Sequence, residues 1–180
     1  GERLALEEGD KWYGVGEEEW IQLFRTVAVE MMMKTVRDDL ASLGINQNVF
    51  TSERALVDAG TVNDVFTDLE GKKLIYNGLL EAPKGMKLDD WEPREQTLFK
   101  SSNFGDDIDR PLKKSDGSWT YFANDIAYHY DKYRRGFTSM INIFGSDHSG
   151  YVKRMKAAVS AITGNAGTLN IKLCQIVHLK

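Results

Sequence analysis

The sequence predicts a mixed α/β fold built around parallel strands. Residues 140–144 (MINIF) form a short apolar run that is typical of a buried strand. Residues 151–162 carry apolar side chains at helical spacing, and residues 169–177 form a second apolar run with strand character. Strand, helix and strand in this order make a right-handed βαβ unit. We therefore expect the two strands to pair in parallel, with the helix packed across them.

The chain before this unit opens with a weakly patterned stretch, residues 1–16, which predicts the end of a helix and a loop. A long packed helix is then predicted from Glu17 to Leu43, with Gly44 as its stop and three glutamates in its first turn. Its apolar positions are Trp20, Phe24, Val27, Met31, Val36, Leu40 and Leu43. We interpret the run Met31–Met33 as flexible core filling rather than a promiscuous binding groove or a metal site.

The middle of the chain alternates short patterned segments with breaks. A strand is predicted at residues 45–50, followed by an outgoing loop at 51–56. A second helix is then indicated by apolar residues at helical spacing, namely Val62, Val65, Phe66 and Leu69. The glycine- and proline-broken region 71–93 favours a hairpin within KLIYNGLLEAP. Short strands are expected at 97–99 and 111–114, with Asp116-Gly117 as a tight turn.

Composition bounds the class of protein. The 180 residues are 42% hydrophobic and suit one domain or a compact pair. Residues 1–109 carry 12 basic and 23 acidic side chains, a net of −11, whereas residues 110–180 carry 11 and 4, a net of +7. The basic half could approach phosphate groups, or Lys153, Arg154 and Lys156 could be the solvated face of a helix.

The expected location is the cytoplasm. No apolar run approaches the ~18 residues of a membrane span, and no secretory leader is visible. The single cysteine, Cys174, fits a reducing compartment, and its apolar surroundings (IKLCQIV) favour an inert core thiol. The acidic cluster of Asp106, Asp107 and Asp109 lacks the spacing of a calcium loop and is followed by Arg110. We interpret it as a loop with turn hydrogen bonds and an ion pair, and we assign no metal site.

Two neighbouring segments, residues 121–132 and 145–148, carry polar and aromatic side chains that could bind a ligand. Tyr121 and Asp125 are four residues apart, so on a helix they lie one above the other. The apolar residues of this segment map to the opposite side, which leaves a polar and aromatic stripe of Tyr121, Asp125, Tyr128 and Lys132. Gly145 to His148 follow the predicted strand, and open α/β sheets place ligands at the carboxyl ends of their strands. His129 and His178 are interpreted as structural.

These stretches also carry a resemblance to a known family. TYFANDIAYHYDKY followed by INIFGSDHSGYVKRMKAAV resembles the catalytic domain of bacterial arginyl-tRNA synthetases, which are class I enzymes. The resemblance extends in order through EEEWIQLFRTVAVEMMMKTVRDDLASLGI, VFTSERAL, DDWEPREQTLFKSSNFGDDIDRPLKKSDGS and LCQIVHL. It implies the second half of a Rossmann-like catalytic domain with a helical segment and a small α+β connective insertion. The implied parts are residues 1–57 (helix and strand), 58–118 (insertion) and 119–180 (Rossmann-like half).

The resemblance also implies a function and its residues. Arginyl-tRNA synthetases activate arginine with ATP and Mg²⁺ to arginyl-adenylate and transfer it to tRNA(Arg). It implies that Tyr121, Asp125 and His148 contact arginine and that Gly145 and Asp147 contact the ATP ribose. From the residues alone, structural roles for these side chains remain as alternative interpretations. Asp125 could complement a helix end beside a packing Tyr121, Asp147 could be an N-cap, and His148 could face solvent.

Several departures qualify the resemblance. Class I synthetases need a HIGH-type histidine motif and a KMSKS-type lysine loop, and neither occurs in the 180 residues. The resemblance places the first before Gly1 and the second shortly after Lys180. We therefore assign no catalytic residue and no tightly bound cofactor, and expect the isolated piece to be inactive. A stand-alone module that binds arginine or a nucleotide, or a pure interaction domain, is the alternative. The absence of GxxxxGK[ST] and of GxGxxG after a strand disfavours P-loop enzymes and dinucleotide dehydrogenases.

Overall fold

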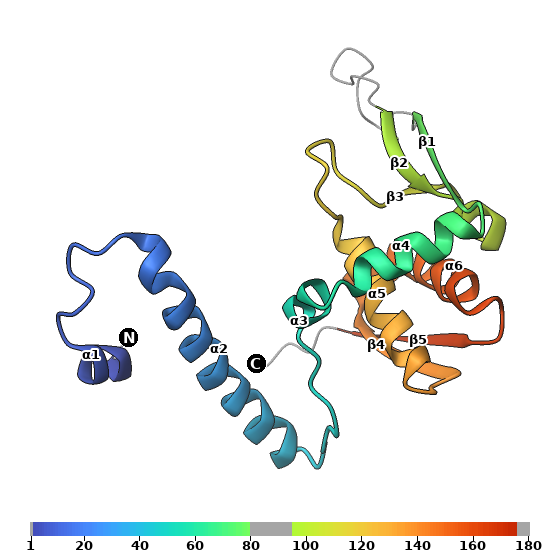
Figure 1. The fold of residues 1–180 in the computed structure, drawn as a ribbon. Coiled ribbons are helices and arrows are strands. Elements are labelled where there is room, and N and C mark those ends of the chain that lie inside the picture. The colour runs from blue at the N-terminus through green and yellow to red at the C-terminus, as the bar shows by residue number, and fades with distance from the viewer. Residues whose placement is uncertain (1, 80–94, 176–180) are drawn as a thin grey trace. The chain divides into compact units, whose positions relative to one another are not determined.

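The computed structural model describes residues 2–79 and 95–175, which form a mixed α/β structure (Figure 1). The chain divides into two units, Gly1–Phe50 and Thr51–Lys180, and each is described by itself. No helix in the described part of the chain is long and apolar enough to cross a membrane.

The described residues of the first unit form two helices, α1 (Glu2–Glu8) and α2 (Glu17–Ser42), with loops after each. The predicted helix and its stop are confirmed, since Gly44 has a φ of +75° and its amide donates to the carbonyl of Ala41 at 2.9 Å. Trp12 packs edge-on against Phe24, with ring centroids 6.3 Å apart, and connects the loop after α1 to α2.

Two predictions for this unit are wrong. No residue of α2 is buried, and Met31 and Met32 are 41% and 63% exposed, so the methionines do not fill a core. The only other helix described in the unit, α1, has 7 residues and is too short to cover one of 26. Residues 45–50 form no strand. A strand needs a hydrogen-bonding neighbour, and the described part of this unit offers none.

The second unit contains the predicted βαβ unit. Strands β4 (Ser139–Gly145) and β5 (Thr168–Cys174) pair in parallel, and α6 (Val152–Thr163) connects them after the 3₁₀ helix η3 (Ser146–Tyr151). The parallel pairing is therefore confirmed as far as Cys174, while residues 176–177 of the predicted strand lie outside the described residues. The register pairs Ser139 with Thr168 and Gly145 with Cys174. Gly145 thus reaches the carboxyl edge of the sheet.

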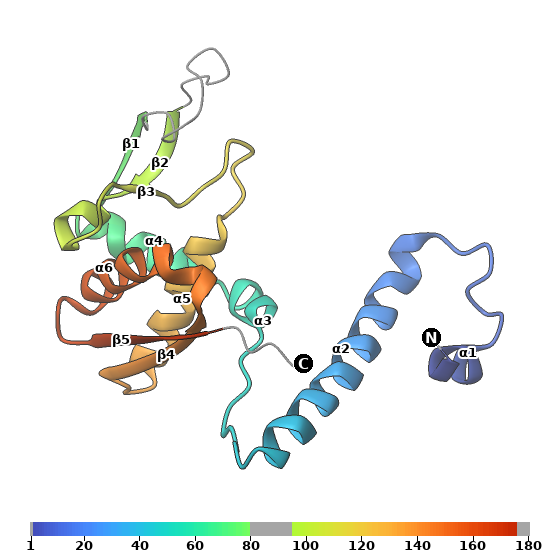
Figure 2. The same ribbon diagram turned by 180° about the vertical axis from the view of Figure 1, so that it is seen from behind.

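Three more helices accompany this sheet: α3 (Glu53–Asp58), α4 (Thr61–Gly71) and α5 (Tyr121–Arg134). The predicted helices around Val65 and Ile126 are α4 and α5. In both views α4, α5 and α6 lie on the same side of β4 and β5 (Figures 1 and 2). The loop predicted at residues 51–56 is wrong, because α3 begins there. Ser52 caps that helix by accepting a hydrogen bond from the amide of Ala55 at 3.3 Å.

A second, antiparallel sheet has the order β1 (Ile75–Leu79), β2 (Glu95–Phe99) and β3 (Arg110–Pro111), with the 3₁₀ helix η2 (Ser101–Phe104) after β2. The strand predicted at 97–99 is confirmed. The hairpin predicted within residues 73–83 continues outside the described residues, and its first half, β1, pairs with β2.

The strand predicted at 111–114 is reduced to β3 and an isolated bridge between Lys113 and Trp119. The tight turn before Trp119 is confirmed, because Gly117 has a φ of +81° and Asp116 accepts from the amide of Ser118 at 2.8 Å.

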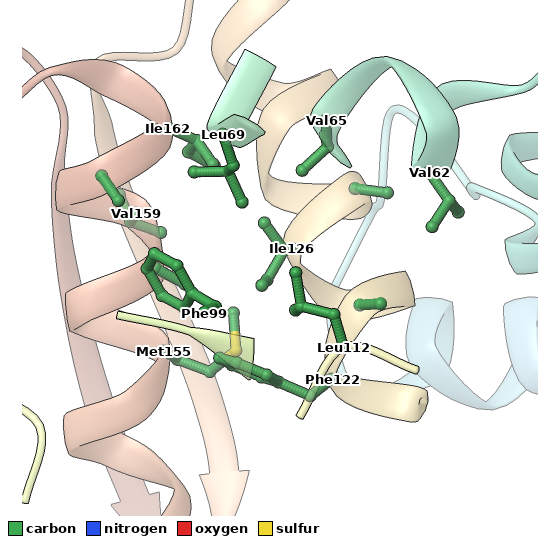
Figure 3. Packing of buried hydrophobic residues seen from close by; sticks show 14 of the residues in the cluster. Val62, Val65, Leu69, Phe99, Leu112, Phe122, Ile126, Met155, Val159 and Ile162 are labelled. Atoms are coloured by element: carbon green, nitrogen blue, oxygen red, sulfur yellow. The ribbon is translucent and has the colours of Figure 1, made fainter. Parts of the chain in front are cut away.

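One hydrophobic core holds the second unit together (Figure 3). Leu69 of α4, Ile126 of α5 and Met155 of α6 are fully buried in it, with Phe99 of β2. Residues predicted for the insertion and for the Rossmann-like half therefore share one core, and the division at residue 118 stays a prediction. Burial of such side chains stabilises the fold by roughly 1.5–3 kcal/mol each.

Within the described part of the second unit, helices cover one face of the parallel sheet. Along β4 burial alternates, with Met140 and Asn142 buried and Ile141 and Ile143 66% and 72% exposed. The prediction of a buried strand is therefore right for the face that the described helices cover and wrong for the opposite face. The prediction of an inert core thiol is also wrong. Alternation along β5 places Cys174 opposite the covered face, and its thiol is exposed and free.

Candidate functional site

The N-terminus of α5 orients the predicted arginine-binding residues. Thr120 caps the helix, since its Oγ1 accepts from the amide of Ala123 at 3.3 Å and donates to the carbonyl of Pro111 at 3.1 Å. The cap holds the start of α5 against β3. Ala123 and Ile126 face the core, which leaves Asp125 half-buried at the edge of that face.

A pocket of about 150 Å³ lies between α3 and α5. It is lined by Thr51, Glu53, Leu56, Asn124, Asp125 and Tyr128. Asn124 Nδ2 donates to Glu53 Oε1 at 2.6 Å and so joins the two helices. This bond also fixes the amide orientation, because only the nitrogen can donate to a carboxylate. The pocket therefore presents two carboxylates and an aromatic ring.

The Asp125 carboxylate also has a hydrogen-bond partner, Tyr151, that does not line the pocket. The hydroxyl of Tyr151 donates to Asp125 Oδ2 at 2.5 Å. Burial, followed by the bond to this carboxylate, raises the pKa of Tyr151 well above its ordinary value of 10.0, so the hydroxyl stays protonated and acts as a donor. The carboxylate is thus held between the pocket and Tyr151.

The loop after β4 carries the predicted ribose site. Gly145 has extended backbone, with φ −63° and ψ 152°, and the Asp147 carboxylate oxygen Oδ1 lies in the space that a Cβ at position 145 would need. Glycine therefore lets the carboxylate fold back over the end of the strand. The N-cap interpretation of Asp147 is wrong, because no side-chain hydrogen bond caps η3 or α6.

His148 follows Asp147 in the same segment, η3. Its Nε2 lies 3.6 Å from Asp147 Oδ2, and the two side chains are 59% and 71% exposed. Its ring centroid is 5.8 Å from that of Phe144 and 6.4 Å from that of Tyr151. The exposure fits the solvent-facing interpretation, while the contact with Tyr151 brings His148 into the neighbourhood of Asp125.

Tyr121 is the predicted site residue that the structure brings least into the site. It is 79% exposed and does not line the pocket. The Lys114 ammonium lies 5.8 Å from its ring centroid. In the predicted stripe, Tyr128 lines the pocket, and Lys132 Nζ lies 4.1 Å from the Tyr128 ring centroid. Burial lowers the pKa of Lys132.

His129 is structural, as interpreted from the sequence. It is 3% exposed, its Nδ1 lies 2.7 Å from the carbonyl oxygen of Asp125, and its Nε2 lies 2.7 Å from Asn142 Nδ2. The tautomer that satisfies both bonds has Nδ1 donating and Nε2 accepting. Burial lowers the pKa of His129, which favours this neutral ring. The ring thus connects α5 to β4. His178 lies outside the described residues.

The acidic cluster forms the predicted ion pair. Arg110 donates to both oxygens of Asp106, at 2.7 and 2.8 Å, and Lys153 Nζ lies 2.7 Å from Asp107 Oδ1. In residues 2–79 and 95–175, no group of three or more His, Cys, Asp or Glu residues could hold a metal ion.

Comparison with known proteins gives independent information on the family of this chain. No protein-family model matches the chain. The arginine–tRNA ligase of Rhodospirillum rubrum is 56% identical over 176 residues, which is 98% of this chain and 30% of that ligase. The arginine–tRNA ligase of a Ruegeria species is 56% identical over 179 residues, 99% of this chain and 31% of that ligase. The chain matches one segment of arginine–tRNA ligases.

A solved structure agrees with this match. A putative arginyl-tRNA synthetase from Campylobacter jejuni superposes with a TM-score of 0.76 at 31% identity, covering 97% of this chain and 34% of that chain. The family resemblance predicted from the sequence is therefore confirmed. The chain spans 30–31% of the length of the arginine–tRNA ligases cited above.

Sequence reasoning missed three residues of the site. Glu53 and Asn124 form the hydrogen bond across the pocket, and Tyr151 binds Asp125. Glu53 lies in VFTSERAL, one of the segments that resemble arginyl-tRNA synthetases, and this was its only signal. Tyr151 is the first residue of the helical pattern at residues 151–162, and nothing in that local pattern indicates that its hydroxyl reaches back to α5.

Proposed function

We propose that this chain supplies the arginine-binding pocket and part of the ATP site of an arginine–tRNA ligase. The whole enzyme would activate arginine with ATP to arginyl-adenylate and transfer it to tRNA(Arg) in the cytoplasm. The match to arginine–tRNA ligases supports the reaction. The observation that carries the proposal is the pocket that Asp125 and Glu53 both line.

The pocket suits the side chain of arginine. A guanidinium is planar, always charged, and has five donors in a fork that matches carboxylate oxygens. Asp125 and Glu53 would receive these donors, and two carboxylates at one pocket attract a cation. Tyr128 offers a ring face against which a guanidinium packs favourably. Tyr121, one turn before Asp125, would close over the bound arginine from the exposed side.

The neighbouring loop would hold the nucleotide. Gly145 is the last residue of β4, and Asp147 and His148 follow it at the carboxyl end of the strand, where open α/β sheets bind ligands. Asp147 would accept from the ribose hydroxyls, while His148 would contact arginine between the two sites. ATP would bring its Mg²⁺. In this proposal the parallel pair β4–β5 is part of a Rossmann-like class I domain, and residues 58–118 are its connective insertion.

Asp125→Asn in a full-length arginine–tRNA ligase that contains this segment tests the proposal. The change keeps the shape and removes the charge, and breaking a desolvated charged pair costs roughly 2–5 kcal/mol. We expect kcat/KM for arginine to fall about 30-fold to several thousand-fold, with the KM for ATP nearly unchanged.

The matched control is Asp131→Asn on the same helix, whose carboxylate pairs with Arg135 at 2.9 Å and lies outside the pocket. This variant should leave kcat/KM for arginine unchanged. If Asp125 is only a helix-end carboxylate, its variant would melt a few degrees lower and still saturate normally with arginine, which would refute the proposal.

A further inference from the structure

Tyr151 connects the two halves of the proposed site. Its hydroxyl is 2.5 Å from Asp125 Oδ2, although the two residues are 26 positions apart and belong to different elements. A carboxyl group on its terminal torsion rotates broadly, so an aspartate at the edge of an open pocket has no single orientation by itself. The hydrogen bond from Tyr151 restricts that rotation.

The ring that carries this hydroxyl is itself held in place. Its centroid lies 6.1 Å from that of Phe122 and 6.4 Å from that of Phe144, both in edge-on contacts. The Arg154 guanidinium carbon lies 5.0 Å from the ring centroid. The half-buried ring thus contacts α5, β4 and α6, and cannot turn without disturbing them.

The same ring reaches the loop that follows β4. His148 lies edge-on to Tyr151, with ring centroids 6.4 Å apart. The residue therefore touches the predicted arginine-binding groups on both sides, Asp125 through its hydroxyl and His148 through its ring.

We propose that Tyr151 is a positioning residue that holds the Asp125 carboxylate in the orientation that receives the guanidinium of arginine. The inference rests on the proposed function, because it assigns Tyr151 a role only through Asp125. A donated hydrogen bond occupies Oδ2 and leaves the remaining lone pairs of the carboxylate directed to other donors. Without it the carboxylate samples orientations that bind arginine less well.

The test is Tyr151→Phe in the full-length ligase, which keeps the ring and removes the hydroxyl. We expect the KM for arginine to rise roughly tenfold to a hundredfold, the range for one hydrogen bond to a charged group. The KM for ATP should stay within about twofold.

Tyr76→Phe is the matched control. Its hydroxyl donates to Asp109 Oδ2 at 2.8 Å in the antiparallel sheet, so the same chemical deletion is made outside the site. It should not change the KM for arginine. A Tyr151→Phe enzyme that melts lower yet keeps wild-type KM values for both substrates would show a purely structural role and overturn the inference.

Asp125→Ala separates the inference from the proposal on which it rests. If Tyr151 acts through Asp125, adding Tyr151→Phe to Asp125→Ala should lower kcat/KM for arginine, measured below saturation, by less than about a further twofold. If Tyr151→Phe weakens arginine use in the Asp125→Ala enzyme as much as it does in the wild type, the inference is overturned. If Asp125→Ala leaves arginine use unchanged, the proposed function itself fails. If it abolishes arginine saturation while Tyr151→Phe has no effect, only the inference fails.

Discussion

The ion pair between Asp106 and Arg110 offers a strong test of what holds the second unit together. The Asp106 side chain is 0% exposed and that of Arg110 is 16% exposed. Arg110 donates to both carboxylate oxygens, and the hydroxyl of Ser101 and the amide of Asp107 donate as well, at 3.1 and 2.8 Å. Asp106→Asn would remove the negative charge at nearly constant volume and leave the Arg110 guanidinium without its counter-charge.

Breaking a buried pair by removing one partner costs about 3–5 kcal/mol, because the remaining charge stays desolvated. For a unit of this size each kcal/mol lowers Tm by roughly 3–5 °C, so we expect Tm to fall by about 9–25 °C. Thermal unfolding, monitored by circular dichroism, measures this change in Tm. The control is Asp58→Asn, whose partner Arg54 lies 3.7 Å away with both side chains more than half exposed, and we expect almost no change. A loss below about 1 kcal/mol for Asp106→Asn would refute the reasoning.

The same pair predicts a pH dependence. Burial raises the pKa of Asp106, but the hydrogen bonds from Arg110 and from the amide of Asp107 outweigh it, so the pKa lies below its ordinary value of 3.8. A lowered pKa in the folded state stabilises the protein above pH 3.8, and this stabilisation is lost as the pH falls through the folded-state value. The stability difference between wild type and Asp106→Asn should therefore be full at neutral pH and shrink in acid. A difference that grows on acidification would contradict this assignment.

Three further changes have definite expected results. Ile126→Ala, at a fully buried core position, should cost about 2–5 kcal/mol in chemical unfolding, whereas Ile141→Ala on the exposed face of β4 should cost under 1, and equal losses would contradict the core described. Lys72→Met should cost about 1 kcal/mol, because Lys72 Nζ donates to two carbonyls at the end of α6 at 3.2 and 3.3 Å, and an unchanged Tm would show that these bonds contribute nothing. Gly145→Ala should raise the KM for ATP by displacing Asp147 with little change in Tm, since its φ of −63° suits alanine, and an unchanged KM would argue against the ribose site.

Much of the second unit could be predicted from the sequence because its patterns are strong and local. Apolar residues at helical spacing located α4, α5 and α6, whose buried faces meet in one core. The apolar runs around Ile141 and Ile171 located β4 and β5, and the helix predicted between them, as in a βαβ crossover, then gave their parallel pairing. Gly117 marked a turn in this unit, as Gly44 marked a helix end in the first unit, because glycine adopts the positive φ that both positions have.

The failures share a physical cause, which is that burial depends on neighbours that the local pattern does not contain. An apolar stripe on α2 predicts a helix, but whether Met32 is buried depends on what lies against it. An apolar run containing Cys174 predicts a strand, but the exposed side of that strand depends on which face the helices cover. The missed helix α3 has a different cause, because its 6 residues are too few for helical periodicity to be detected.

The candidate site was predictable where its residues were neighbours in sequence. Asp125 and Asp147 could be named from their spacing and from the resemblance to arginyl-tRNA synthetases. The hydrogen bond between Glu53 and Asn124 joins residues 71 positions apart, and only the fold reveals it. The exposure of Tyr121 likewise depends on what surrounds the start of α5.

The central claim is that Asp125 recognises the positive charge of arginine. The most direct measurement compares arginine with citrulline, its neutral analogue, in pyrophosphate exchange by full-length wild-type and Asp125→Asn enzymes. Wild type should bind arginine much more tightly than citrulline, and the variant should lose most of that preference, about 30-fold or more, by weakening arginine while leaving the inhibition constant of citrulline nearly unchanged. A variant that is folded and keeps the wild-type ratio between the two ligands would contradict the claim.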